Sequence, residues 1–487
     1  MDFIISAVVL FILIFIFIRR LWISSSSSSS PVRSRLLGTM GWPFIGETLD
    51  FISCGYTDHP QSFMDKRRLL IIPVQDRYGI CLRYGKVFKS HLFGSPTIVS
   101  TDAEVSRIVL QSDANSFVPS YPKSLTELMG GSSILRINGN LHRRIHGLIG
   151  GFFKSPYLKA QVTSEMRKLI LQSMDTWKED RPIYIQDESK HIAFQVLAKT
   201  LMGLDPGEEM EYLRIQFQKF IAGLMSLPLK LPGTQLHRSL QAKKKMVKLV
   251  LKIIRDKRMN VSPDSKDVAD VLLNDKSEKL TDELISDNMI DLMIPGEDSV
   301  PLLITLAIKY LSDCPKALHQ LKEENLELKT RKEDLGESLC WDDYLSMPFT
   351  QSVITETLRM GNIIMGVIRK AMKDVEIKGY LIPKGWCVLT HFRSVHLDEN
   401  HHQSPHLFNP WRWQDRDMSS GSSSCFTPFG GGLRLCPGLD LARLEASIFL
   451  HHFVTNFRWV AEEDTIINFP TVRMKKKMPI WVKREMN

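Results

Sequence analysis

The ten residues from Phe429 to Gly438 read FGGGLRLCPG and place one thiol, that of Cys436, behind a glycine-rich turn. A helix is predicted to follow from Leu439 to about Asn456. The amides of the turn and of the helix N-terminus would therefore face the sulfur and favour its anion. A thiolate is a soft, strongly donating ligand for a metal ion. The loop thus offers a metal-binding sulfur, and the rest of the motif indicates which metal centre it suits.

The other residues of this motif suit a flat, charged cofactor. Glycines such as Gly432 let the backbone approach a macrocycle closely. Phe429 can cover the face of the cofactor, and Arg434, two positions ahead of the sulfur, can reach a propionate. Each of these elements has a role if Cys436 ligates the iron of haem.

Two simpler interpretations of Cys436 compete with haem ligation. The glycines could form a flexible loop around a buried thiol, or the thiol could be a catalytic nucleophile. A nucleophile needs a histidine base. The nearby His451 and His452 lie on the following helix, and nothing in the sequence indicates that either ring reaches the sulfur. Chance agreement with the whole pattern Phe-x-x-Gly-x-Arg-x-Cys-x-Gly is improbable, which favours haem.

Two further motifs place charged residues on predicted helices. Glu356 and Arg359 form an i, i+3 pair, which is common on any helix and contributes only about a few tenths of a kcal/mol. The stretch Ile294–Ser299, IPGEDS, lies inside a helical run from Asp282 to Leu311. Its proline removes a backbone hydrogen bond, and Gly296 permits a close approach of a neighbour. A solvated acidic turn is the alternative interpretation.

The elements that must position these motifs are mostly helical. From Thr101 to about Arg359, apolar residues recur at spacings of three and four. A strand-like pair precedes this region over residues 86–100, and short strand-like pieces follow it. A long irregular stretch then leads to the cysteine loop. The pattern predicts a mainly α fold with small β-sheets.

Composition limits the compartment and the partners. The 487 residues include seven cysteines without a CxxC pair, which favours a reducing compartment over a disulfide framework. The net charge of +9 favours an acidic protein surface, anionic lipid or nucleic acid. The sequence carries no signature of a DNA- or RNA-binding domain, so we expect no nucleic-acid partner.

The N-terminus predicts a membrane anchor. Residues 3–18 are apolar apart from Ser6, and Arg19 and Arg20 then precede Leu21–Ile23. The span is long enough for a bilayer if the arginines snorkel. A cleaved secretory peptide is disfavoured because the basic residues follow the apolar run. We expect an anchor over 1–23, a serine-rich linker over 24–37 and a cytosolic body over 38–487.

Together these motifs resemble those of the cytochrome P450 monooxygenases, from about Gly38 to the C-terminus. The resemblance implies the cytochrome P450 fold and haem b (iron protoporphyrin IX) bound through Cys436. Arg412, in the phrase FNPWRW, stands where the family has a second arginine. It would join Glu356 and Arg359 in a buried charge cluster that supports the haem loop, and losing one member would strand the others.

The resemblance also assigns proton delivery to the IPGEDS stretch. In the family this helix lies over the haem, and an acid and an alcohol deliver protons to bound dioxygen. The match puts Asp298 at the acid and Ser299 at the alcohol, and Gly296 is counted with them among the catalytic residues. Serine replaces the usual threonine here, and Pro295 replaces a small residue. Serine keeps the hydroxyl but lacks the methyl group that restricts the rotamer.

Further residues are assigned by the same resemblance to the propionates and the substrate. His142 and His146 lie on a segment similar to the helix that approaches the propionates, although the family often has tryptophan in place of His142. Arg369 matches another propionate-binding arginine. By analogy, the residues that face the substrate are Phe117, Val118, Ile294 and Val367.

Haem with a thiolate ligand favours O–O cleavage and oxidation of unactivated C–H bonds. The sequence has no nicotinamide or flavin fingerprint, so the resemblance implies electrons from NADPH through a separate NADPH–cytochrome P450 reductase. It also implies a single-pass protein of the endoplasmic reticulum membrane with a cytosolic catalytic domain. An apolar, membrane-tethered site predicts a lipophilic substrate.

Phrases such as GWPFIGETLDF and MIPGEDSVP resemble the plant brassinosteroid-biosynthetic branch of the family, nearest to the enzymes that hydroxylate the steroid side chain at C-23. Hydroxylation at C-22, or of another plant sterol or triterpenoid, is the alternative. A rival class is a haem protein that isomerises or dehydrates its substrate without a reductase. Such a protein would also need Cys436 but should lack the acid–alcohol pair that Asp298 and Ser299 provide. Residues 69–82 form an apparent insertion rich in aliphatic side chains, so an inactive membrane protein is a further alternative.

Overall fold

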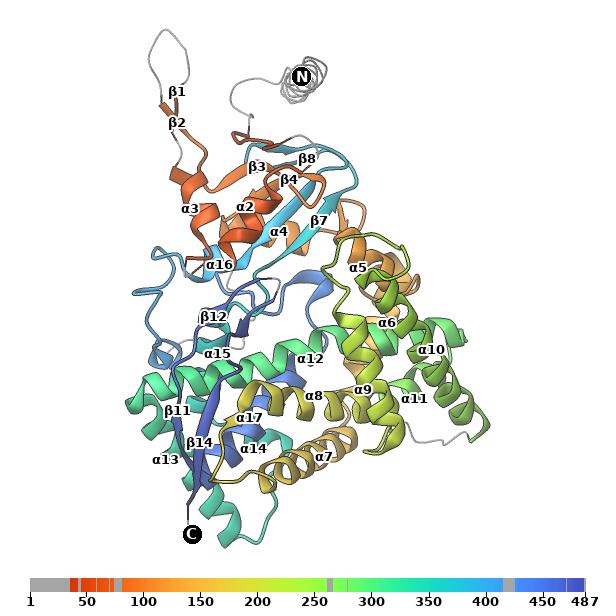
Figure 1. The fold of residues 1–487 in the computed structure, drawn as a ribbon, viewed down its shortest axis with the longest axis vertical. Coiled ribbons are helices and arrows are strands. Elements are labelled where there is room, and N and C mark those ends of the chain that lie inside the picture. The colour runs from red at the N-terminus through yellow and green to blue at the C-terminus, as the bar shows by residue number, and fades with distance from the viewer. Residues whose placement is uncertain are drawn as a thin grey trace, which may run out of the picture. The chain divides into compact units, whose positions relative to one another are not determined.

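The computed structural model describes residues 36–42, 45–57, 59–69, 84–260, 266–277, 279–414, 425–469 and 471–485, together with the backbone of 71–73 and 81–83. The chain forms two compact units (Figure 1). Unit 1 comprises the described parts of Met1–Ser120, Met365–Val395 and Asn468–Pro470. Unit 2 comprises those of Tyr121–Ile364, His396–Ile467 and Thr471–Asn487.

Unit 1 contains a five-stranded sheet built from β3 (Val87–Leu92), β4 (Ser95–Ser100), β5 (Phe117–Pro119), β7 (Gly366–Ala371) and β10 (Cys387–His391). The strand order is β3-β4-β10-β7-β5, with β4 and β10 parallel and the other neighbours antiparallel. β3 and β4 form a hairpin whose turn residues, Phe93 and Gly94, both have positive φ, as tight hairpin turns favour. The strand-like pair expected over 86–100 is confirmed.

The other elements of unit 1 flank this sheet. Asp102 caps one of its helices by accepting hydrogen bonds from the N–H groups of Glu104 and Val105. The backbone at the two ends of the apparent insertion pairs as an antiparallel hairpin of β1 and β2, and residues 74–80 lie outside the described part. The bounds are β1 (Ile71–Pro73), β2 (Cys81–Arg83), α2 (Thr48–Cys54), α3 (Ser62–Leu69), α4 (Ala103–Gln111), β8 (Val375–Ile377), β9 (Tyr380–Ile382) and α16 (Phe392–His396).

Unit 2 is mainly helical. Its helices are α5 (Lys123–Leu128), α6 (Gly139–Phe152), α7 (Pro156–Asp175), α8 (Ile185–Met202), α9 (Glu208–Ile221), α10 (Gln235–Met259), α11 (Val268–Leu273), α12 (Asp282–Asp313), α13 (Pro315–Asp334), α14 (Trp341–Leu345), α15 (Pro348–Gly361) and α17 (Leu439–Asn456). Two 3-10 turns are η2 (Pro410–Trp413) and η3 (Gly432–Arg434). The strands are β6 (Ile183–Tyr184), β11 (Phe457–Ala461), β12 (Ile466–Ile467), β13 (Arg473–Met474) and β14 (Pro479–Arg484). The mainly α fold with small sheets is confirmed.

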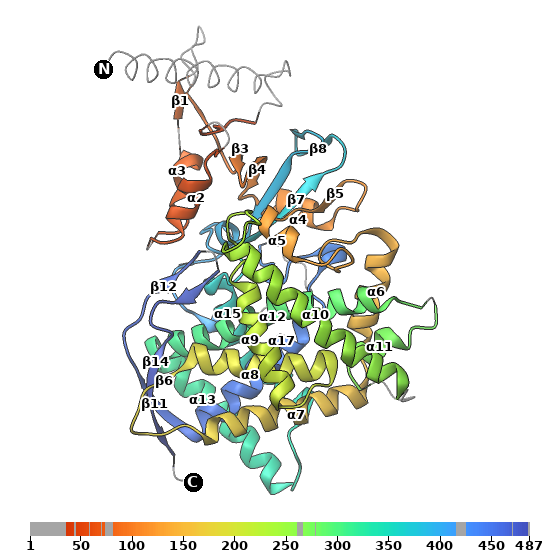
Figure 2. The same ribbon diagram turned by 45° about the vertical axis from the view of Figure 1, so that its right-hand side comes forward.

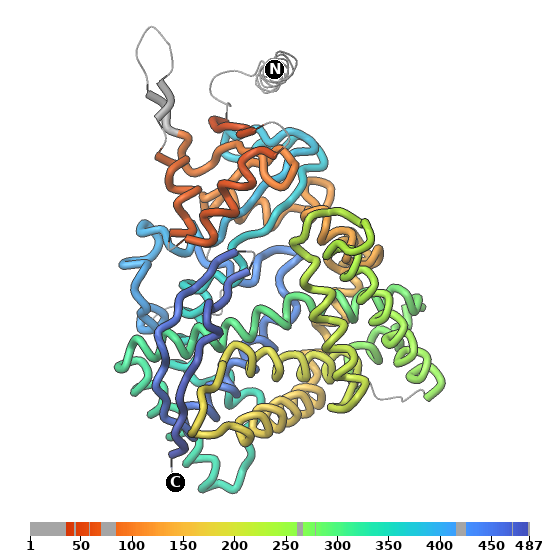
Figure 3. Tube along the Cα trace, viewed as in Figure 1, coloured from red at the N-terminus to blue at the C-terminus, as the bar shows by residue number. Residues whose placement is uncertain are grey.

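The 32-residue helix α12 lies at the centre of this unit, where it packs along α8 and also contacts α10, α15 and α17 (Figure 2). Thr281 caps its N-terminus by accepting a hydrogen bond from the N–H of Leu284. The helix continues through Pro295 and Pro301. Its second half is buried almost continuously, as expected for a helix that is apolar on every side. β11 and β14 pair antiparallel along one edge of the unit, at the blue end of the trace in Figure 3.

A segment between α5 and α6 is fixed by side chains of α12. The N–H of Gly130 donates to Asp291 Oδ2 at 2.9 Å, and the N–H of Ile134 donates to Asn288 Oδ1 at 2.8 Å. The Asn288 amide in turn donates to the carbonyl oxygen of Ser132 at 3.0 Å. These bonds satisfy backbone groups that have no ladder partner in this irregular stretch.

Within the described residues, no helix is both long enough and apolar enough to cross a bilayer. The predicted anchor, residues 1–23, lies outside the described part of the chain, as does the linker up to residue 35.

Candidate active site

The cysteine loop is a hydrogen-bonded turn that ends at the start of α17. The N–H of Gly430 donates to the carbonyl of Thr427 at 3.0 Å, and the N–H of Cys436 donates to that of Phe429 at 3.1 Å. Gly430 and Gly432 have φ values of 77° and 64°, in the left-handed region that favours glycine. α17 begins at Leu439, as predicted from the sequence. The loop therefore holds the sulfur of Cys436 close to a helix N-terminus.

Burial raises the pKa of the Cys436 thiol, while a hydrogen bond from the N–H of Gly438 lowers it by less. The amide therefore favours the anion, as expected from the sequence, but loss of hydration outweighs it. A metal cation at the sulfur reverses this balance, since a coordinating thiol is deprotonated outright. A soft sulfur donor on a glycine turn fits a haem iron, and Cys436 would be its protein ligand.

Arg434 and His146 form hydrogen bonds with the backbone around the cysteine loop. The Arg434 guanidinium donates to the carbonyls of Ile134, at 3.1 Å, and Ile137, and to Asn138 Oδ1 at 2.8 Å. His146, on α6, has Nε2 2.8 Å from the carbonyl oxygen of Leu435. Both residues thus connect the cysteine loop to α6 and the segment before it, contacts that the sequence did not predict.

The buried neighbour of His146 is His142, whose ring centroid lies 5.5 Å from that of His146. His142 is almost inaccessible to solvent. Arg369, on β7 in unit 1, is also buried, and its Nη1 lies 3.4 Å from the carbonyl oxygen of Ile368. Binding of propionates by these residues stays a prediction.

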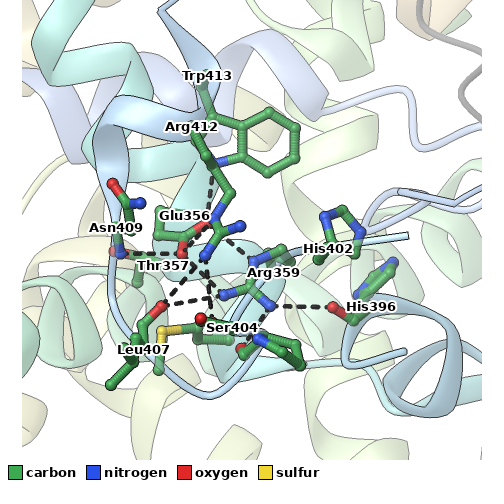
Figure 4. A network of polar contacts seen from close by, with 12 residues as sticks. Glu356, Thr357, Arg359, His396, His402, Ser404, Leu407, Asn409, Arg412 and Trp413 are labelled. Atoms are coloured by element: carbon green, nitrogen blue, oxygen red, sulfur yellow. Dashed lines mark hydrogen bonds and ion pairs between the residues drawn. The ribbon is translucent and has the colours of Figure 1, made fainter. Parts of the chain in front are cut away.

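The predicted charge cluster is present and is centred on Glu356 (Figure 4). Arg359 binds this carboxylate in a bidentate manner, with Nε 2.9 Å from Oε2 and Nη2 2.8 Å from Oε1. Arg412 Nε lies 3.0 Å from Oε1. Glu356 and Arg359 are both 0% exposed, so each charge depends on the other for compensation.

The same network also contains Trp413 and Asn409, which were not assigned to it from the sequence. The indole of Trp413 donates to Glu356 Oε2 at 2.8 Å, and the N–H of Asn409 donates to Oε1 at 3.0 Å. Arg359 also donates to the carbonyls of Pro405, at 2.7 Å, and His396, at 3.0 Å. The signal that could have identified Trp413 is its place directly after Arg412 in the phrase FNPWRW.

On α12, the two predicted proton-delivering residues have defined partners. Asp298 forms an ion pair with Lys190 of α8, with Oδ1 2.5 Å from Nζ. Ser299 donates its hydroxyl hydrogen to the carbonyl of Pro295, one turn earlier. A Cβ at Gly296 would meet Leu197 Cδ1 at 2.7 Å, so this glycine accommodates α8. The close approach inferred from the sequence is confirmed, with Leu197 as the neighbour.

Glu297 is a second acid at this point and was missed in the sequence. It is 5% exposed, and its Oε2 has no hydrogen-bond partner among the described residues. Burial raises its pKa to about 7, and the charge of Asp298 adds to the rise, while Lys190 and Arg214 oppose it. A carboxyl group with such a pKa holds a proton over part of the physiological range. Its place directly before Asp298 was the available signal.

The four predicted substrate residues lie on two strands and one helix. Phe117 and Val118 are on β5 and Val367 is on β7, in unit 1, whereas Ile294 is on α12 in unit 2. Successive side chains of a strand point to opposite faces, so Phe117 and Val118 cannot both face one ligand. Phe117 packs in the apolar core of unit 1. Val118 is only partly buried, which leaves it the better candidate of the two.

Glu445 lies on α17, the helix that follows the cysteine loop, and its burial makes the stability of the folded protein depend on pH. It is 2% exposed, and burial raises its pKa to about 8. A carboxyl group whose pKa is raised by folding contributes stability that is full below pH ~4.5 and is lost as the pH rises towards 8. Glu445→Gln removes this titration. We expect its stability relative to the wild type to increase by about 2 to 4 kcal/mol from pH 5 to pH 9.

Denaturant midpoints of both proteins, measured across this range, check the Glu445 prediction. The result that contradicts it is a constant difference between the two proteins at every pH. Opposing titrations of buried histidines, such as His451, whose pKa burial lowers to about 4, affect both proteins equally and cancel in the comparison.

Comparison with known proteins identifies the class. The sequence model of the cytochrome P450 family matches residues 80–481, and the chain belongs to this family. It is a haem-thiolate monooxygenase of the kind that the cysteine loop and the Glu356 cluster indicated. The solved structure of retinoic acid-bound cyanobacterial CYP120A1 has the same fold, with a TM-score of 0.80, 23% identity and coverage of 93% of this chain and 100% of that one.

Among curated relatives, a 3-epi-6-deoxocathasterone 23-monooxygenase of Arabidopsis thaliana is 64% identical over 92% of this chain and 89% of its own length. A second Arabidopsis thaliana protein with the same activity in its name is 52% identical over 91% of this chain and 84% of its own length. The resemblance to the brassinosteroid-biosynthetic branch is thereby confirmed.

Proposed function

We propose that this monooxygenase hydroxylates the side chain of a brassinosteroid precursor at C-23, using O2 and two electrons from NADPH. One observation carries the proposal: the Cys436 loop and the Glu356 cluster occur in a chain that is 64% identical to a steroid 23-monooxygenase. Haem held by Cys436 supplies the oxidation of an unactivated C–H bond. The remaining residues bind, orient and provide protons.

Proton delivery is assigned to α12. The Ser299 hydroxyl donates its hydrogen to the Pro295 carbonyl. Once this proton is delivered, the preceding residue, Asp298, is the acid that can reprotonate the hydroxyl. The ion pair with Lys190 fixes Asp298, so the carboxylate must leave Lys190 before it can serve the hydroxyl. Gly296 contributes by letting α8 approach this turn of the helix.

The remaining assignments extend the same proposal. The haem propionates would be bound by Arg369, His142, His146 and Arg434. Phe429 would cover the face of the cofactor. The electrons come from NADPH–cytochrome P450 reductase, and an anchor over 1–23 with a linker over 24–37 holds domain 38–487 on the cytosolic face of the endoplasmic reticulum. The apparent insertion, 69–82, is compatible with activity because its ends close on each other as a β1–β2 hairpin.

Ser299→Ala tests the hydroxyl. We expect steroid hydroxylation to fall about 100-fold while NADPH consumption continues, because a positioned proton donor typically contributes that much. Product formed per NADPH consumed is the measurement. Ser299→Thr, which keeps the hydroxyl, is the matched control and should retain the wild-type ratio. An unchanged ratio in the alanine variant would refute the assignment.

The function itself is tested with the full chain in membranes that contain NADPH–cytochrome P450 reductase. The substrates are 3-epi-6-deoxocathasterone, named for the relative, and a panel of other plant sterols. We expect an NADPH-dependent product with a new hydroxyl group at C-23, located by mass spectrometry and NMR. Oxidation at C-22 or only of another sterol, by folded and haem-loaded protein, overturns the proposal.

A variant that lacks residues 69–82 is the matched control for the insertion. Activity in both proteins supports the proposal. Activity in the deletion variant alone shows that the insertion inactivates this chain, which would make it a membrane protein without the proposed function.

A further inference from the structure

His396 connects the charge cluster to the start of the cysteine loop. It is 1% exposed, and the N–H of Thr427 donates to its Nε2 at 3.0 Å. Its Nδ1 lies 2.8 Å from Asn362 Oδ1. The backbone carbonyl of the same residue accepts a hydrogen bond from Arg359 at 3.0 Å, and Figure 4 shows this carbonyl directed at the guanidinium.

These contacts fix the protonation state of the imidazole. A backbone N–H can only donate, so Nε2 must present its lone pair to Thr427. The proton of the neutral ring is then on Nδ1 and points at Asn362. The Asn362 amide nitrogen donates to the carbonyl of Arg359 at 2.7 Å, which turns its oxygen towards the histidine. Each polar atom in the series therefore has one role that agrees with its neighbours.

Thr427 is the point at which this series enters the cysteine loop. Its N–H is bound by His396, and its carbonyl accepts the N–H of Gly430, which opens the turn. The turn closes where the N–H of Cys436 donates to the carbonyl of Phe429. A second, apolar connection runs in parallel, because the Phe426 ring lies 5.3 Å from that of His396 and 4.8 Å from that of Trp413.

We propose that His396, as the neutral Nδ1–H tautomer, is a positioning residue that fixes the cysteine loop to the Arg359–Glu356 cluster. His396 does not touch the reacting atoms. Its carbonyl accepts a hydrogen bond from Arg359 of the fully buried ion pair, and its Nε2 accepts one from the N–H of Thr427. The ion pair thereby restrains Thr427, and through the loop it restrains the sulfur. This inference rests on the proposed ligation of haem by Cys436.

The test uses full-length, haem-loaded protein and follows the absorption of the reduced CO complex. The rate at which the thiolate-type band is lost at a fixed temperature reports how firmly the loop presents the sulfur. In His396→Phe the Thr427 N–H and the Asn362 oxygen lose their partner, so we expect about tenfold faster loss of the band. His396→Gln keeps an acceptor oxygen near the place of Nε2, and we expect its rate to stay within about threefold of the wild type.

Two further variants keep the proposal falsifiable. Asn362 has a φ of 45°, so Asn362→Gly removes the partner of Nδ1 without backbone strain, and we expect faster band loss in this variant too. His319→Phe, on an exposed part of α13, is the matched control and should behave like the wild type.

The outcomes separate the two proposals. A wild-type lifetime in His396→Phe, or equal loss in the phenylalanine and glutamine variants, overturns the role of the Nε2 acceptor. If His396→Phe does not fold, an unchanged lifetime in Asn362→Gly overturns it instead. Absence of the thiolate-type band in the wild type would refute haem ligation by Cys436, and with it the proposed function.

Discussion

Cys436→Ser is expected to abolish the thiolate-type absorption of the reduced CO complex and to lower steroid hydroxylation by at least about 100-fold. Removing a hydrogen-bond partner of a metal ligand typically lowers metal affinity or activity 10- to 100-fold, and removing the ligand itself should lower activity further. The hydroxyl is nearly isosteric with the thiol but does not ionise at neutral pH, so it cannot supply the electron donation on which O–O cleavage depends. The backbone turn around residue 436 does not use the side chain and should persist.

Absorption spectra and turnover with reductase are the two measurements for Cys436→Ser. Cys340→Ser, at an exposed position that caps α14, is the control and should match the wild type in both. Serine is at least as good a helix cap as cysteine, so no loss of stability is expected there. A serine variant at 436 with a wild-type spectrum and unchanged turnover would eliminate the sulfur as the ligand.

Arg359→Ala is expected to prevent accumulation of haem-loaded enzyme. The substitution leaves the Glu356 carboxylate fully buried, with Arg412, Trp413 and Asn409 as its remaining partners among the described residues. Breaking a buried pair from one side costs about 3 to 5 kcal/mol, a large part of the stability of a domain. The carbonyls of Pro405 and His396 also lose their donor, which loosens the approach to the cysteine loop.

Haem content per folded protein and the denaturant midpoint are the measurements for Arg359→Ala. Arg458→Ala is the control, because its side chain is 80% exposed in an ion pair with Glu485, and its effect should stay within about 0.5 kcal/mol. Normal haem content in Arg359→Ala would mean that the cluster does not support the cofactor loop.

The features that the sequence predicted best are those with strong local or electrostatic signatures. α17 starts directly after Pro437 and Gly438, and α12 starts behind the capping residue Thr281, so both helix starts follow from residue type. The Glu356 cluster was predicted through the family resemblance, which placed Arg412 beside the Glu356–Arg359 pair, because that pair alone is common on any helix.

The contacts that the sequence did not predict depend on backbone groups. Arg434 and His146 can donate equally well to a propionate or to a carbonyl, and only the fold brings the carbonyls of Ile137 and Leu435 within reach. His396 is neutral and binds the backbone of Thr427, which lies 31 positions away in the chain, so neither charge nor periodicity marks it. The pKa of Cys436 depends on burial, which the motif does not specify.

The irregular segment fixed to α12 has a mechanical consequence. Its amides at Gly130 and Ile134 are bound to side chains of the helix, not to neighbouring strands, so the segment cannot shift without breaking bonds to α12. Its fluctuations should therefore follow those of the helix, although it lacks regular structure. The conformation of this part of the chain is consequently preorganised by the same helix that carries Asp298 and Ser299.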